Sequence, residues 1–417
     1  MSNSVARKLA RFKPGYLYVG MDLGLDNNIA KVMDERARVI GTVRFTHNQA
    51  GYAHLADRLT YYVRRHTASG VVVAMEPTNY FWMLVAAELD RRGIEYYLVN
   101  AYTVHQHRCG DNLDRSKDDP RDAFTVGDLL RTGKYTETRL LRGDYAELRQ
   151  YAVLHERLQT DIGRQKTILR NTVGVVFPEL TTVFKNLAGE AAMAMLWNHA
   201  AAAAIRQMTE DEFIAAVRAD CQCRRLMVSK LAKAYKLAAV SVGLADGIEA
   251  LQHSVRSTLK QLRLLETEAA SVRALLIRTF KRLPESKPLL TLHGLGVVSA
   301  AIILAEIGNP QDYRHGAQLV KLAGTQPAPN TSGRKTYSPT PMSRQGRSRL
   351  RTVLYFACMR LVQIDPDFAQ RYEQLQKRDK NPLTKKQALG ALMNKLLRIL
   401  WALMRHKGSY MSATQAA

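Results

Sequence analysis

The sequence predicts an α/β domain at the N-terminus followed by an all-α remainder. Short apolar strands up to about residue 99 and heptad-spaced apolar residues after residue 144 carry this prediction. A chain of 417 residues has room for two or three domains, since single cores rarely grow past about 250–300 residues. We expect domains at 16–135, 144–283 and 289–412.

The N-terminal domain is predicted from five short apolar runs. They indicate strands at 16–22, 29–33, 39–45, 71–75 and 96–99. Helices at about 49–66 and 80–92 fall between the later strands. Three strands in sequence, followed by alternating helix and strand, is the order of a ribonuclease-H-like layer, although other α/β folds share this pattern.

The middle of the chain predicts a coiled-coil arm. Heptad-like spacing relates Leu148, Tyr151, Leu158, Ile162 and Leu169. A second run keeps the 3-4 alternation for about four heptads, at Ile248, Leu251, Val255, Leu262, Leu265, Ala269, Val272 and Leu276. The alanine-rich stretch between them, about 180–245, contains the capping-box pattern of Thr209 and Glu212. We therefore expect an antiparallel arm with a small helical insert at its tip.

The C-terminal part, 289–412, is predicted to be helical apart from an irregular stretch at 324–347. From Tyr313 through Ile364 the sequence has nine Lys or Arg residues and no Asp or Glu. A segment with basic but no acidic residues is a candidate nucleic-acid-binding surface or active-site loop. Leu292–Ile302 is compatible with a helix-hairpin-helix that binds phosphate, and equally with a glycine turn inside a core.

The net charge of +24, from 61 basic and 37 acidic residues, points to a polyanionic partner. A ribosome-associated protein or a protein bound to an anionic membrane surface would have a similar positive net charge. The four cysteines lack zinc-ligand spacing, which indicates reduced thiols in the cytoplasm. The N-terminus has no secretory signal, and the longest apolar stretch is too short to span a bilayer. We expect a soluble, cytoplasmic, DNA-associated protein and no membrane partner.

Four carboxylates stand out by their positions. Asp22 ends the first predicted strand and Glu76 ends the fourth, so adjacent strands would bring them close together. Pro120 suits the first turn of a helix, which makes Asp119 its N-cap and places Asp122 one turn along the same face. Carboxylates so grouped can hold the two hard cations that phosphodiester cleavage uses.

Each carboxylate also has a simpler interpretation. Asp22 could be a turn residue, Asp119 only a helix cap, and Asp122 a solvated charge. Glu76 is harder to explain this way, because a carboxylate after four apolar residues is costly to bury without a partner. The order of the four residues favours the metal cluster.

The acid-free window offers a nucleophile. Ser332 precedes the flexible Gly333 and the cations Arg334 and Lys335. A serine hydroxyl needs activation by a base or a metal-bound environment. Composition alone does not separate Ser332 from Ser338, Ser343 or Ser348. The residues predicted to bind nucleic acid are Arg334, Lys335, Arg344, Arg347, Arg349 and Arg351.

Taken together, these motifs resemble the transposases of the insertion sequence 110 family, the bridge-RNA-guided recombinases. The N-terminal match joins Tyr18–Gly24, Met75–Thr78 and Lys117–Ala123. The C-terminal match joins Leu292–Gly296, Ala305–Gly308, Ala323–Pro327 and Thr331–Gly333, and continues through Ser343–Gly346 and Leu350–Arg351.

The resemblance implies a RuvC-like domain whose DEDD cluster is Asp22, Glu76, Asp119 and Asp122, and a transposase domain whose catalytic serine is Ser332. It implies Mg²⁺, donor and target DNA, a guide (bridge) RNA and a covalent phosphoserine intermediate. It also implies a homo-oligomer, a dimer or tetramer, in which Ser332 of one subunit completes the DEDD site of another.

The sequence departs from the family pattern in several places, and the insert at about 180–245, whose role the sequence does not reveal, makes the chain longer than a compact member. Asp118 stands where a Thr is usual, which leaves open which of the adjacent aspartates binds metal. Arg344 replaces a Lys and Arg347 an Asn. Two alternative functions are a RuvC-type junction nuclease, which would use water in place of serine, and a nucleic-acid-binding protein without enzymatic activity.

Overall fold

The computed structural model describes residues 3–12, 14–77, 80–111, 119–137, 140–220, 228–328, 330–332, 335–337 and 340–411. At 3–4, 108–111, 119, 220, 330–332 and 335–337 the description covers the backbone alone. The chain divides into two units, Met1–Leu140 and Leu141–Ala417.

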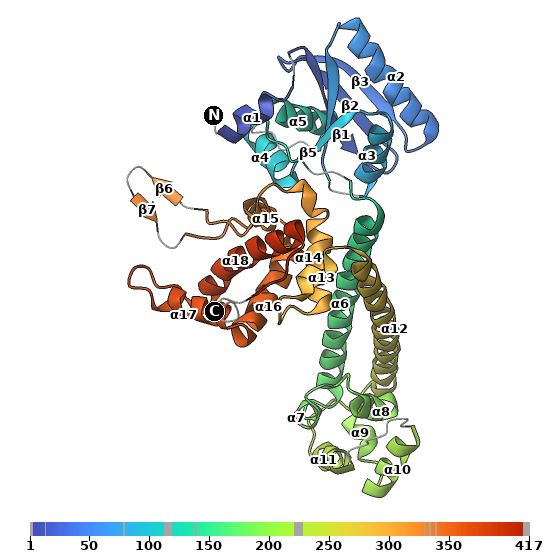
Figure 1. Cartoon of the computed structure of the whole chain (residues 1–417). Helices are drawn as coiled ribbons and strands as arrows, with labels where there is room; N and C mark the ends of the chain where they lie inside the picture. Colours follow the sequence, from blue (N-terminus) through green and yellow to red (C-terminus); the bar gives the residue numbers. More distant parts are fainter. Residues whose placement is uncertain are drawn as a thin grey trace. The chain divides into compact units, whose positions relative to one another are not determined.

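A five-stranded sheet forms the centre of the first unit (Figure 1). Its strands are β1 (Tyr16–Leu23), β2 (Asn28–Met33), β3 (Val39–Phe45), β4 (Gly70–Met75) and β5 (Glu95–Leu98). They lie in the order β3-β2-β1-β4-β5, with β1, β2 and β3 antiparallel and with β4 and β5 parallel to β1. This order is consistent with the predicted ribonuclease-H-like layer.

Helices cover both faces of the sheet, so the strands are apolar on both sides. Leu17, Val19 and Met21 of β1 pack in one core cluster with residues of α2 (Gln49–Arg65) and α3 (Phe81–Arg91). Tyr18 of β1 packs on the opposite face with residues of α5 (Asp119–Arg131). Side chains therefore alternate between the two faces along β1, as strand geometry requires.

Helix α5 packs against β1 at a point where neither backbone carries a side chain. A Cβ added to Gly20 would lie 2.0 Å from the Ala123 carbonyl oxygen and 2.2 Å from the Gly127 nitrogen. Glycine is thus required at residue 20 by close approach rather than by its backbone angles. This contact fixes the position of α5 on the sheet.

The second unit contains two long helices, α6 (Gly143–Val176) and α12 (Ile248–Arg282). They pack along each other in antiparallel directions, because Arg282 pairs with Asp144 at 2.8 Å while Lys166 pairs with Glu266 at 3.0 Å (Figure 1). Predicted seam residues such as Leu148, Leu169 and Leu276 are buried.

Between α6 and α12, leaving aside residues 221–227, which are not described, five short helices form a separate core with the adjoining parts of both. They are α7 (Leu180–Val183), α8 (Glu190–Asn198), α9 (Ala202–Ile205), α10 (Glu210–Asp220) and α11 (Val228–Ala239). The predicted capping box is confirmed: the Thr209 N–H donates to the Glu212 carboxylate at 2.8 Å, and the Glu212 N–H donates to the Thr209 hydroxyl at 3.3 Å.

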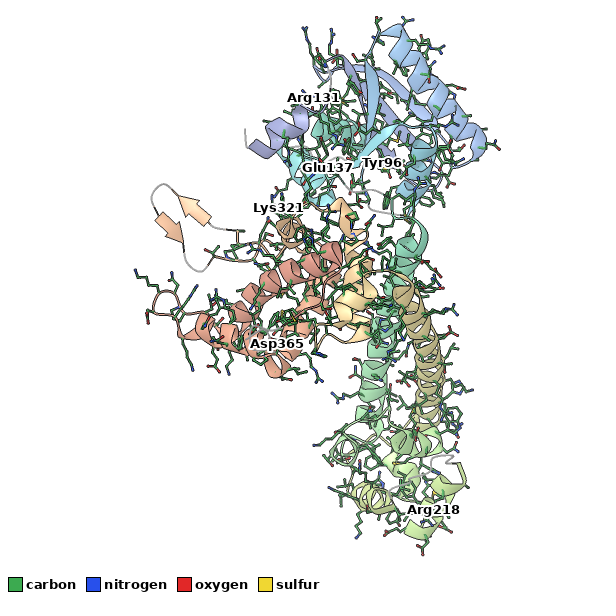
Figure 2. The ribbon with its side chains drawn as sticks, viewed as in Figure 1. Tyr96, Arg131, Glu137, Arg218, Lys321 and Asp365 are labelled. Atoms are coloured by element: carbon green, nitrogen blue, oxygen red, sulfur yellow. The ribbon has the colours of Figure 1, made fainter. Side chains whose placement is uncertain are left out.

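The C-terminal helices share one core with the first part of α6 and the end of α12. They are α13 (Ser286–Leu290), α14 (Val297–Ile307), the 3₁₀ turn η1 (Pro310–Asp312), α15 (Gly316–Ala323), α16 (Ser348–Ile364), α17 (Pro366–Lys377) and α18 (Lys385–His406). Buried Asp365 separates α16 from α17 and accepts a hydrogen bond from the Phe368 N–H at 3.1 Å (Figure 2). Leu396, Leu397 and Leu400 are core residues, as predicted.

The sequence-based predictions of strands and long helices are confirmed to within a few residues. Helices α1 (Asn3–Leu9) and α4 (Ala101–Asp111) were not predicted. The expectation of an irregular stretch at 324–347 needs correction, because it contains strands β6 (Asn330–Ser332) and β7 (Lys335–Tyr337). The three-domain division stays a prediction. Within the described residues, no helix is both long and apolar enough to cross a membrane.

The contact between Gly20 and α5 predicts a large effect of one methyl group. Gly20→Ala should lower the free energy of unfolding by about 3 kcal/mol, the upper end of typical overpacking costs, because the added atom meets rigid backbone. Gly163→Ala is the matched control: its added Cβ has open space on α6, and it should stabilise by about 0.5–1 kcal/mol. Urea unfolding of both variants, monitored by circular dichroism, measures the change in the free energy of unfolding. Equal stability of the two variants would contradict the close packing.

Candidate functional site

Asp22 and Glu76 lie side by side at one edge of the sheet. Met21 of β1 is in parallel register with Met75 of β4, and Asp22 and Glu76 are the residues that follow each of them. Gly20 and Ala74, two positions earlier, face α5. Because side chains alternate along a strand, Asp22 and Glu76 belong to the same face. Both are partly buried.

Helix α5 begins near this edge. Its first residue is Asp119, and Pro120 lines the same pocket as Ile29, the residue directly opposite Asp22 on β2. Asp122, on the first turn, is buried, with 6% of its surface exposed. It is therefore not the solvated surface charge of the simpler interpretation. Asp22, Glu76 and the start of α5 thus share one edge and one face of the sheet.

The complete four-carboxylate cluster stays a prediction. Among the described side chains, no group of three His, Cys, Asp or Glu residues is arranged to hold a metal ion. The side chain of Asp119, the fourth predicted ligand, lies outside those described, as does all of Asp118. What the fold contributes is carboxylate oxygens from two strands and one helix, the kind of donor that Mg²⁺ prefers.

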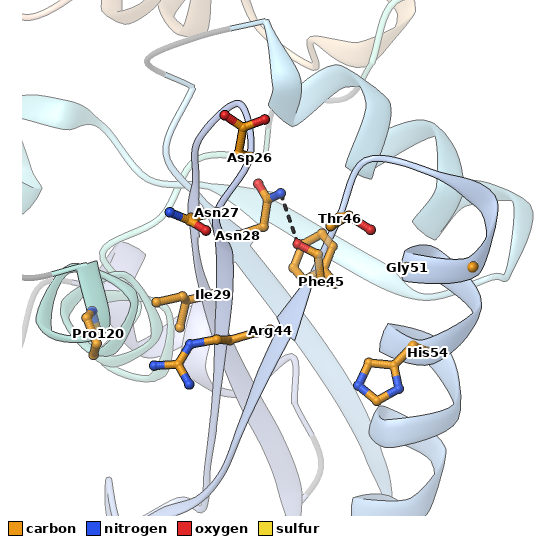
Figure 3. A pocket seen from close by; sticks show the side chains of 11 residues that line it. Asp26, Asn27, Asn28, Ile29, Arg44, Phe45, Thr46, Gly51, His54 and Pro120 are labelled. Atoms are coloured by element: carbon orange, nitrogen blue, oxygen red, sulfur yellow. Dashed lines mark hydrogen bonds between the residues drawn. The ribbon is translucent and has the colours of Figure 1, made fainter.

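A pocket of about 640 Å³ lies beside this edge (Figure 3). It extends from the turn between β1 and β2, past β3, to the first residues of α2 and α5. Asn28 closes one side of it and donates a hydrogen bond to the Phe45 carbonyl at 3.1 Å. The guanidinium of Arg44 and the imidazole ring of His54 contribute nitrogen atoms to its lining.

Ser332 lies on β6, in a hairpin that extends from the helical body of the second unit (Figure 1). β6 and β7 are antiparallel, and Ser332 is in register with Lys335. The description there covers the backbone, and Gly333 and Arg334 lie outside the described residues. The structure therefore places Ser332 near a hairpin turn but gives no side-chain contact for it.

The stem of this hairpin is tightly held. Arg344 donates its N–H to the Gly324 carbonyl at 2.9 Å, and Ala328 donates to the Pro341 carbonyl at 2.8 Å. The two segments of the stem come so close that a Cβ on Gly346 would lie 2.4 Å from the Gly324 nitrogen. The stem therefore fixes where the hairpin leaves the helical body.

Three of the predicted nucleic-acid-binding arginines make contacts within the second unit. Arg351 donates to the carbonyls of Ala323 and Gly346, both at 2.9 Å, and so closes the stem. Arg349 pairs with Glu306 at 2.8 Å, and Arg347 approaches the same carboxylate at 3.8 Å. These bonds give the three arginines a structural role, and their contact with nucleic acid stays a prediction. Arg344 is exposed, and its backbone is left-handed with φ of 55°.

Sequence reasoning did not identify Glu306, the centre of this ionic cluster. Its surface is 3% exposed, and Arg149 donates to the carbonyls of Ala305 at 2.6 Å and Glu306 at 3.0 Å. Burial and the nearby Arg347 lower the pKa of Arg149 to about 10. A single Glu within the apolar run of α14 was the available signal, since a carboxylate there needs a cationic partner.

Comparisons with known proteins cover both regions. Residues 19–178 match the DEDD transposase domain of IS110, and residues 286–373 match the transposase domain of the IS116/IS110/IS902 family. Asp22, Glu76, Asp119 and Asp122 fall within the first match, and Ser332 falls within the second.

Three proteins of insertion elements are similar along much of the chain. A 42 kDa protein of IS900 from Mycobacterium paratuberculosis is 23% identical over 96% of this chain and 98% of its own length. A 44.8 kDa protein of IS116 from Streptomyces clavuligerus is 24% identical over 94% and 95%. A protein of the mini-circle element IS117 from Streptomyces coelicolor is 25% identical over 77% and 78%.

Proposed function

Because the chain belongs to the IS110 family of transposases, we propose that it cleaves and rejoins DNA through a Mg²⁺-dependent carboxylate cluster and a serine nucleophile. The cluster comprises Asp22, Glu76, Asp119 and Asp122, and the nucleophile is Ser332. The observation that supports it most is the register of Asp22 and Glu76 at one sheet edge, on the face that α5 covers.

The carboxylates suit this role chemically. Oxygen donors from β1, from the end of β4 and from α5 match the preference of Mg²⁺ for hard ligands. When bound there, Mg²⁺ would supply positive charge to the scissile phosphate. The sheet and α5 hold the donors in fixed positions, so little reorganisation accompanies cleavage.

The serine conserves the energy of the cleaved bond. The Ser332 oxygen bonds to phosphorus while the bond from phosphorus to the leaving sugar oxygen breaks. The hydroxyl proton passes to solvent, and the leaving oxygen takes up a proton. A hydroxyl of another strand can then displace Ser332 and restore a phosphodiester. Water in this role would hydrolyse the strand and leave none of the bond energy stored in a protein–DNA linkage.

The partners of the proposed reaction are donor DNA, target DNA and a guide RNA, bound by a dimer or tetramer of the chain. The net charge of +24 supports polyanion binding, because each neutralised phosphate releases counterions. Arg334, Lys335 and Arg344 are the predicted phosphate contacts nearest the serine. The IS110 assignment disfavours both a junction nuclease and a plain nucleic-acid-binding protein.

The carboxylates should be needed for cleavage but not for binding. Asp22→Asn, Glu76→Gln, Asp119→Asn and Asp122→Asn should each abolish strand cleavage, because an amide keeps the shape of the side chain but loses the charge that holds Mg²⁺. Gel shifts should show nucleic-acid binding largely intact. Asp57→Asn, an exposed aspartate on α2 that is not part of the pocket lining, is the control and should cleave normally. Full activity in any two of the four variants would rule out the cluster.

Ser332→Ala should eliminate a covalent protein–DNA adduct while folding and binding remain unchanged. Denaturing electrophoresis of the protein with labelled DNA detects the adduct, and peptide mapping identifies its residue. Ser343→Ala is the control, since the Ser343 hydroxyl donates to the Gly324 carbonyl at 3.2 Å in the stem. An adduct that persists in Ser332→Ala would show that another residue is the nucleophile. Clean cleavage without an adduct in the unmodified protein would favour the junction nuclease.

Guidance by RNA predicts a defined RNA in the purified protein. Sequencing of the copurified nucleic acid should give one dominant RNA with segments complementary to both the donor and the target DNA. Ribonuclease treatment should then abolish cleavage at specific sites, while the carboxylates and Ser332 remain in place. A random mixture of RNA fragments, with cleavage unaffected by ribonuclease, would contradict RNA guidance and leave the chemistry intact.

A further inference from the structure

A row of residues crosses the sheet next to the carboxylates. Asp22 of β1 lies directly opposite Ile29 of β2, and Ile29 lies directly opposite Arg44 of β3. Directly opposed residues share a face, so Arg44 belongs to the face that carries Asp22. Two strand spacings separate the backbones of these two residues by about 10 Å.

Arg44 is exposed and makes no hydrogen bond or ion pair with any residue that the structure describes. Some other arginines of the first unit are bound: Arg38 pairs with Asp34 at 2.8 Å, and Arg131 donates to Asp128 at 2.9 Å. The neighbours of Arg44, Val43 and Phe45, are buried on the other face of the sheet. Its backbone is therefore fixed while its guanidinium is available to a ligand.

The pocket beside the sheet edge provides space for that ligand. Ile29, Arg44 and Pro120 line one part of its volume of about 640 Å³, so it extends from the β3 edge to the first turn of α5 (Figure 3). Asp26 also lines the pocket, but from the turn between β1 and β2, away from Arg44. The part of the pocket next to Arg44 is thus suited to an anion.

We propose that Arg44 is a positioning residue that binds a backbone phosphate next to the scissile one. This proposal rests on the proposed function, because it needs a DNA strand at the carboxylate edge. A carboxylate cluster repels the phosphates that flank the reacting one, and a cation about two strands away offsets this repulsion. A guanidinium also binds two phosphate oxygens at once, which fixes the strand along the row from Arg44 to Glu76.

The first test follows arginine reactivity in the unmodified full-length protein. Phenylglyoxal modifies exposed guanidinium groups, and mass spectrometry maps the sites. A saturating 20-nucleotide single-stranded DNA, or its duplex, should protect Arg44 at least fivefold. Arg36 is the internal control, because it is an exposed arginine in the turn between β2 and β3, at the far end of these strands, and should stay reactive. Equal reactivity of Arg44 with and without DNA would overturn the proposal.

The second test compares variants on a DNA that the unmodified protein cleaves. Arg44→Gln should lower the cleavage rate at subsaturating DNA by about ten- to a hundredfold, the value of one charge-assisted hydrogen bond. Arg44→Lys should recover part of the lost cleavage rate. The cleavage rate of Arg36→Gln should remain within twofold of that of the unmodified protein. Equal rates for Arg44→Gln and Arg36→Gln would also overturn the proposal. If the protein binds DNA but cleaves none, the proposed function fails, and protection of Arg44 still decides the binding role.

Discussion

The backbone contact between Gly20 and helix α5 determines how the carboxylate edge is built. The helix can approach β1 this closely because Gly20 and Gly127 leave no side chains between the two backbones. With the middle of α5 held there, its first turn reaches the sheet edge next to Ile29, opposite Asp22. A bulkier residue at either glycine would move Asp122 away from the strands that end at Asp22 and Glu76.

A buried ionic cluster has the corresponding role in the second unit. Glu306 on α14 binds Arg349 at the start of α16, while Arg149 from α6 binds the carbonyls at the end of α14. Burying a carboxylate is costly unless cations and hydrogen bonds surround it, and three arginines do so here. The cluster joins three helices. Two residues further along α16, Arg351 donates to the carbonyls of Ala323 and Gly346 and so ties the stem of the serine hairpin to the same helix.

The sequence predicted best where structure depends on neighbouring residues along the chain. Apolar runs located the five strands, and heptad spacing located α6 and α12. Strands β6 and β7 have three residues each, too few for an alternating pattern, so the hairpin was expected to be irregular. Likewise, no local pattern reveals that Arg347 and Arg349 bind Glu306, because their partner lies some 40 residues away along the chain. The proposed role of Arg44 could not be predicted for the same reason, since only strand register aligns this residue with Asp22.

The proposed chemistry is divided between the two units of the chain. The carboxylates lie in Met1–Leu140 and Ser332 lies in Leu141–Ala417, so neither unit contains a complete site. A hydroxyl without a metal-bound phosphate is a weak nucleophile, and carboxylates without the serine cannot store the energy of the broken bond. In the proposed function, cleavage therefore depends on an assembly that brings a carboxylate edge, a serine hairpin and a DNA strand together. Such a dependence would protect DNA, because a protein of this kind that cut before its partners had assembled would leave broken ends with no strand to join.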